Sequence, residues 1–183
     1  VLDLVLQRKL YLPLPIIPDA TQEDGDASYQ GVVHPSRLEC GAEVRIPAEA
    51  ELGDGAEPAP TVNLHWEGHG STGAAIVPRP PSGDTLLFTV PRSAMAANLG
   101  RRLWVYYTVT RAGETPRTSE KFELRVSDFD QRSYPIIQVK GAENRELKLH
   151  EVPVNGALCT LPFWTFMAEG QLLGIEALGR STS

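Results

Sequence analysis

The sequence predicts an all-β protein in which two sheets pack face to face, and three observations support that prediction. Apolar residues recur with a period of two in several short runs, as they do in strands with one buried side. The 15 prolines and 16 glycines among 183 residues separate these runs, and both residue types favour turns over long helices. The hydrophobic share of 42% is enough for a buried core.

The alternating runs follow one another between positions 12 and 127. The most regular is "RRLWVYYTVTR", in which Leu103, Val105 and Tyr107 share one face. The expected strands centre on Leu14–Ile17, Val44, Val62, Ile76, Leu86, Val105 and Leu124. About seven short strands in a little over a hundred residues are typical of an immunoglobulin-like β-sandwich.

Large side chains on the predicted inner faces indicate the core of this sandwich. We expect core packing for Trp66, Phe88, Tyr107 and Phe122. Between the strands, "PRSAMAANLG" predicts one short helical turn, because Pro suits a first helical position and Gly a C-terminal stop.

The pattern restarts after a linker at 128–133. "YPIIQVKGA" repeats "LPIIPDA", and "LCTLPFWTFMAEG" lies over "EVRIPAEAELGDG". We therefore expect residues 134–183 to be the first half, about three strands, of a second similar unit. Residues 1–11 form an N-terminal extension that could supply a strand, since Leu2, Leu4 and Leu6 alternate.

Half a sandwich leaves an apolar face uncovered and strand edges unpaired. The sequence begins at Val1 without Met, so we expect an excised piece of a longer protein. The incomplete unit would then pack on the first unit or on the N-terminal stretch, associate with another chain, or continue in the parent protein.

Motifs in fixed order resemble a known family. "VNLHWEGHGSTG", "FTVPRSAMAANLGRRLWVYYTVTRAGETPRTSEKFELRVSDF" and the restart at "YPII" are similar to the Ig-like tandem repeats of very large, adhesin-like surface or secreted proteins of Gram-negative bacteria. The resemblance covers most of the first unit and the front of the second, and the long stretch "ATQEDGDASYQGVVHPSRLECGA" departs from it. It implies a stalk or surface module whose partners are neighbouring repeats, and it brings no catalytic residues.

Charge and motifs argue against several function classes. The net charge of −6 disfavours nucleic acid, whose binders need a positive face, and no apolar run approaches a membrane span. Cys40 and Cys159 have no second ligand at metal spacing, and a disulfide between them would have to join separate units. No catalytic or cofactor signature is present, so we expect neither enzyme activity nor a cofactor.

Three polar clusters raise the question of a metal. His65 and His69 flank Glu67, but residues four apart on a strand lie roughly 13 Å apart. The acidic run at 23–26 and the linker pair Asp128 and Asp130 supply oxygen ligands of the kind that calcium prefers. Of these, the linker pair is the candidate calcium site. Ordinary turn chemistry explains the acidic run, and we expect the two histidines to be exposed side chains at the end of a strand.

Aromatic residues outside the predicted core suggest an alternative to a spacer. Trp104 and Tyr106 alternate with the apolar face of their strand, and Trp164 lies beside two phenylalanines. Outward aromatic rings could bind a glycan or a protein. The first expectation remains a non-catalytic spacer of a cell-surface or secreted protein, with the binding module as the alternative.

Overall fold

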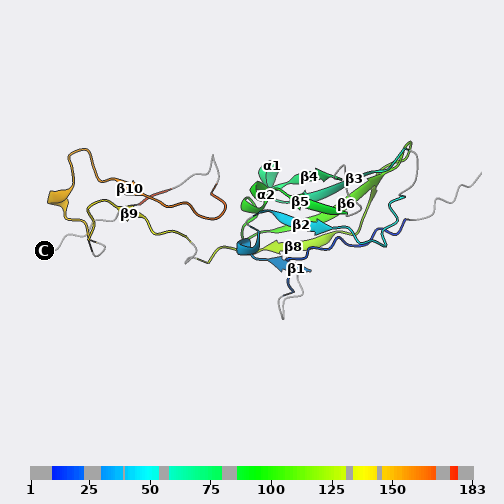
Figure 1. Ribbon diagram of the computed structural model, residues 1–183, viewed down its shortest axis with the longest axis horizontal. Helices are drawn as coiled ribbons and strands as arrows, with labels where there is room; N and C mark the ends of the chain where they lie inside the picture. The colour runs from blue at the N-terminus through cyan, green and yellow to red at the C-terminus, as the bar shows by residue number, and fades with distance from the viewer. Residues whose placement is uncertain are drawn as a thin grey trace, which may run out of the picture.

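The computed structural model describes residues 10–22, 30–38, 40–53, 58–79, 86–130, 134–143, 146–167 and 174–176. Their regular secondary structure is mostly β-strand, with a few short helices (Figure 1). Along the chain the elements are β1 (Gly31–Val33), η1 (Pro35–Arg37), β2 (Ala42–Arg45), β3 (Thr61–Glu67), α1 (Gly70–Gly73), β4 (Ala75–Pro78), β5 (Leu87–Val90), α2 (Arg92–Ala96), β6 (Arg102–Thr110), β7 (Arg117–Thr118), β8 (Phe122–Val126), β9 (Gln138–Val139), η3 (Leu149–Glu151) and β10 (Cys159–Thr160). In the described ranges no helix is long and apolar enough to cross a membrane.

The larger sheet contains most of the strands. Its order is β1-β8-β6-β3-β4, and β7 pairs with β6. The β1–β8 pair is parallel and the other pairs are antiparallel. Because side chains alternate along a strand, Leu64 and Trp66 of β3 point into the protein while His65 and Glu67 lie on the outer face.

The smaller sheet is the antiparallel pair β2–β5, in which Val44 lies opposite Phe88. Ile16 extends it by one bridge, because its N–H and carbonyl exchange two 2.8 Å hydrogen bonds with Arg45. The segment before β1 therefore pairs with one sheet, whereas β1 itself pairs with the other.

The core lies between the two sheets. Trp66, Phe88 and Tyr107 are among its largest fully buried side chains. Phe122 is only partly buried and packs against this core from β8. The protein is thus all-β, with one continuous apolar interior that both sheets share.

The first expected strand differs most from the prediction. Around Leu14–Ile17 the chain makes only the Ile16 bridge, because Pro13, Pro15 and Pro18 cannot donate a ladder hydrogen bond. Two strands were not expected, β1 and the two-residue β7. All three residues of β1 are buried, so its sequence shows no alternation.

The expected helical turn is α2, which joins β5 to β6. Pro91 stands at its N-cap, and Gly100 beyond its C-terminus has a positive φ of 69°. The buried Asn98 fixes this end of the sandwich. Its amide donates to the carbonyls of Gly73 (2.7 Å) and Ala94 (2.6 Å) and accepts the backbone N–H of His69 (2.8 Å).

Residues 134–167 extend away from the end of the sandwich at which α2 lies (Figure 1). Here β9 and β10 form an antiparallel pair with Val139 opposite Cys159. The expected third strand, at 171–177, falls largely outside the described residues, as does the possible strand within 1–11. Several apolar side chains are strongly exposed, namely Ile136, Val154, Leu158 and Phe163.

One side chain of this C-terminal part enters the core of the sandwich. Phe166 is only 2% exposed and belongs to the core cluster. Its ring centroid lies 5.7 Å from that of Phe129, and the Arg92 guanidinium stands 5.5 Å above it. Its φ of 68° is the one positive value at a non-glycine residue in the described chain, so this contact holds the turn in a conformation that most residues avoid.

Candidate functional site

The outer face of β3, β6 and β8 carries the two outward-facing aromatic residues of β6. Trp104 and Tyr106 lie two residues apart on β6 and share this face. Trp104 is 41% exposed, and its cross-strand neighbours are Glu67 on β3 and Glu123 on β8.

Tyr106 is already held by two neighbours. The His65 imidazole stacks on its ring at 4.8 Å with an interplanar angle of 3°. From the other side of β6, the Lys121 ammonium stands 4.4 Å from the ring centroid. Little of the Tyr106 ring face therefore remains for a ligand.

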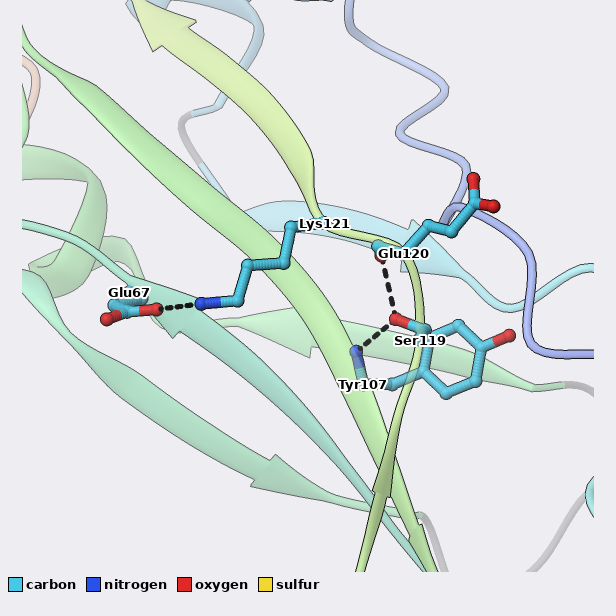
Figure 2. A network of polar contacts seen from close by, with 5 residues as sticks. All are labelled: Glu67, Tyr107, Ser119, Glu120 and Lys121. Atoms are coloured by element: carbon cyan, nitrogen blue, oxygen red, sulfur yellow. Dashed lines mark hydrogen bonds and ion pairs between the residues drawn. The ribbon is translucent and has the colours of Figure 1, made fainter. Parts of the chain in front are cut away.

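Ion pairs border the exposed indole. Lys121 reaches across β6 to the Glu67 carboxylate at 3.1 Å (Figure 2), and Arg102 lies 3.7 Å from Glu123. Each carboxylate beside Trp104 thus has a cationic partner, and the four charges sum to zero. Exposed pairs of this kind add little stability, but they keep donors and acceptors at fixed places around the ring.

Burial shifts the titration of two groups on this face. It lowers the pKa of His65 below the usual histidine value, and Glu67 opposes that shift while Lys121 adds to it. Burial also raises the pKa of Tyr106, with Glu67 as the next cause. At neutral pH we therefore expect an uncharged imidazole, whose Nε2 lies 2.9 Å from the Thr108 hydroxyl.

The third predicted aromatic residue lies elsewhere. Trp164 is half-buried in the turn that carries Phe166, where its carbonyl accepts the Met167 N–H at 3.0 Å. Among the described residues, no aromatic ring contact joins Trp164 to Trp104 or Tyr106. The structure thus brings two of the three predicted binding residues together and leaves the third in the C-terminal part.

No third acidic, histidine or cysteine side chain joins the predicted calcium pair in the described chain. Asp128 and Asp130 are both exposed, and no group of three or more His, Cys, Asp or Glu side chains gathers in the parts that the structure describes. Calcium takes six to eight oxygen ligands. Calcium binding by this pair stays a prediction, and the acidic run at 23–26 lies mostly outside the described residues.

Sequence reasoning missed one polar pair that the fold assembles from distant positions. The Ser127 hydroxyl and the His34 Nδ1 lie 3.0 Å apart on the surface. A nucleophilic serine also needs a third group that orients the histidine, and no carboxylate contacts His34 in the described ranges. Cys40 and Cys159 are likewise exposed, as free thiols.

Comparisons with known proteins return no relative. No family model matches the chain, and neither the curated proteins nor the solved structures contain a match.

Proposed function

We propose that this chain is a non-catalytic, immunoglobulin-like tandem-repeat segment that acts as a spacer in a large bacterial cell-surface or secreted protein, with a role in adhesion. Its partners would be the neighbouring repeats of the same protein. The strand arrangement supports the immunoglobulin-like part of the proposal. The first segment of the chain pairs with the smaller sheet at Ile16 and then with the larger sheet through β1. This pairing, together with two sheets packed face to face, fits an immunoglobulin-like sandwich.

The burial of the Phe166 side chain in the core of the sandwich is the observation on which the spacer proposal rests. A spacer keeps a defined length only if successive units have a fixed relative orientation. A flexible linker alone would not fix that orientation. The Phe166 side chain anchors the C-terminal part between Phe129 of the linker and Arg92 of α2. Full burial of a phenylalanine contributes roughly 2 kcal/mol, which would favour the docked arrangement over the free one.

Local geometry that recurs in both parts supports the repeat proposal. Gly41 and Gly156 both have positive φ, 102° and 97°. Each precedes an alanine, and Pro47 and Pro162 each follow six positions later. The stretch between glycine and proline pairs antiparallel with the Pro-Ile-Ile segment at Ile16 in the first part. In the C-terminal part it pairs antiparallel with β9, which directly follows Pro-Ile-Ile.

Backbone ¹⁵N relaxation tests the spacer proposal directly. We expect residues of β3, β6 and β8 to report the same rotational correlation time as residues around β9 and β10. In Phe166→Ala the two parts should separate, and the C-terminal part should report a shorter time. Phe163→Ala is the matched control, because Phe163 belongs to the same segment but is 89% exposed.

Two results would contradict the spacer proposal. Independent tumbling of the two parts in the unmodified chain would mean that the Phe166 contact does not fix their orientation. An unchanged correlation time in Phe166→Ala would mean that something else holds the parts together.

A further inference from the structure

We propose that Trp104 is the platform of a binding site for a neutral sugar ring, on the outer face of β3, β6 and β8. This activity adds to the spacer role and does not depend on it. The proposal rests on the exposure of the indole, the chemistry of its neighbours and the local balance of charge.

The position of Trp104 is the first step. It lies on β6 in the larger sheet, with Glu67 and Glu123 directly opposite it on the two flanking strands. Side chains at such positions have their Cβ atoms about 5 Å apart. A rigid aromatic surface is therefore bordered on both sides by hydrogen-bonding groups, on an element that packing holds in place.

The role of Tyr106 is the second step, and it changes what sequence alone suggested. With His65 stacked on it and the Lys121 ammonium over it, Tyr106 is a support and not a second platform. It positions Lys121 beside Glu67. The site consequently offers one ring face, which suits one sugar residue and not an extended stacked chain.

The charged side chains around Trp104 indicate which class of ligand the site would bind. Glu67 pairs with Lys121 and Glu123 with Arg102, so the four groups that border the indole carry no net charge, while Arg125 lies further along β8, opposite Arg102. The border nevertheless presents ammonium and guanidinium donors next to carboxylate acceptors. A pyranose matches this arrangement, because its C–H face is apolar and weakly positive, as an aromatic face prefers, while its hydroxyl groups donate and accept at the rim.

A protein partner fits this face less well. Interface hot spots lie in apolar, fully desolvated surroundings. Around Trp104 the neighbours are charged. The other strongly exposed apolar side chain of the sheet strands is Ile76, on the edge strand β4.

The three tryptophans of the chain give separate indole signals by which sugar binding can be followed. Indole ¹H–¹⁵N resonances are assigned with single Trp→Phe variants, and the protein is titrated with maltose, cellobiose, lactose and chitobiose. We expect at least one disaccharide to shift the Trp104 resonance with a dissociation constant of about 1 mM. Trp66, which is 1% exposed, should not move, and neither should Trp164.

Variants separate this site from general effects. Trp104→Ala should weaken binding of that disaccharide at least about tenfold, and Glu123→Ala should weaken it less. Ile76→Ala, on the same sheet but outside the site, should leave it unchanged. All three positions lie on the outer face, so the spectra should otherwise remain those of the folded protein.

Several outcomes would overturn the proposal. These are no shift at Trp104 with any of the four sugars at about 50 mM, a shift at Trp164 instead, or a shift with choline chloride alone, which would indicate a cation site. A Trp104 resonance that depends only on protein concentration would assign this face to self-association.

Discussion

Asn98 shows how one side chain fixes an end of the sandwich. It is fully buried, and its amide bonds with three backbone groups, on His69, Gly73 and Ala94. Gly68 and Gly73 leave it room, because a Cβ at Gly68 would overlap the amide and one at Gly73 would press against it. The glycines and the asparagine thus work as one unit that joins α1 to α2.

Asn98→Ala should lower the free energy of unfolding by about 3 kcal/mol, because buried backbone groups would lose their partners. Urea denaturation followed by tryptophan fluorescence measures the change. Ser93→Ala, at an exposed position on α2, should change stability by less than about 0.5 kcal/mol. Equal stability of the two variants would contradict the role assigned to Asn98.

His65 should make stability depend on pH. Its pKa is lowered in the folded protein, so below its usual value of about 6.5 the unfolded chain binds more protons than the folded one. Stability then falls as the pH drops through that value towards the folded pKa. Thermal unfolding at pH 7.5, 6.5 and 5.5 should show this loss, and His65→Gln should reduce it.

The proposed binding residues were predictable only in part. Alternation along β6 was enough to place Trp104 and Tyr106 on the outer face. The support of Tyr106 by His65 and Lys121 depends on strand neighbours 41 and 15 residues away in sequence, and no local pattern encodes that pairing. The same reason explains why the Ser127–His34 contact was missed.

At the scale of elements, regular alternation was the reliable signal. It predicted β3, β6 and β8, each of which has one face more deeply buried than the other. It failed for β1, which is buried throughout, and for the first expected strand, where prolines remove donors. A strand that is buried on both faces, or that contains prolines without N–H groups, cannot be predicted from a two-residue apolar period alone.

The junction between β7 and β8 depends on a side chain that replaces a backbone group. The Ser119 hydroxyl accepts the Tyr107 N–H at 3.0 Å and donates to the Glu120 carbonyl at 2.9 Å (Figure 2). The Ser119 N–H meanwhile donates to the Tyr107 carbonyl at 2.9 Å. Ser119 therefore keeps the chain in register with β6 where the regular ladder is interrupted.

Ser119→Ala should destabilise the fold by about 1–3 kcal/mol, since the buried Tyr107 N–H would have no acceptor. Amide hydrogen exchange should accelerate at Tyr107 more than at its neighbours on β6. Thr118→Ala, one residue earlier and exposed, serves as the control. An unchanged exchange rate at Tyr107 in Ser119→Ala would show that another group satisfies this N–H.

For the whole molecule, the sequence predicts that a second unit begins at residue 134, which stays a prediction, but it does not predict how the C-terminal part contacts the sandwich. The repeat of Pro-Ile-Ile marks residues 134–137 as a restart. The docking of Phe166 depends on the combined position of α2, the linker and a turn with positive φ. Such a contact has no local signature, because an isolated phenylalanine in a turn looks the same whether it is buried or exposed.

The exposed apolar side chains of the C-terminal part lead to a prediction about association. Ile136, Val154, Leu158 and Phe163 are 80%, 111%, 64% and 89% exposed. Several large apolar side chains gathered on one small part favour association with another surface. We therefore expect the full chain to associate with itself, as size-exclusion chromatography with light scattering over a range of concentrations would show.

A shortened chain that ends at Asp130 tests the same prediction about association, because it lacks the exposed apolar side chains. Every residue of the core cluster except Phe166 precedes that position, so the shortened protein should fold. It should lose only the roughly 2 kcal/mol expected for one buried phenylalanine, and it should remain a monomer because the exposed side chains are absent.

If the shortened chain also associated, the contact would lie on the sandwich, and the outer face around Trp104 would be the first place to examine. If it failed to fold, the C-terminal part would be an integral component of the first unit's core, and the two parts could not be described as successive repeats.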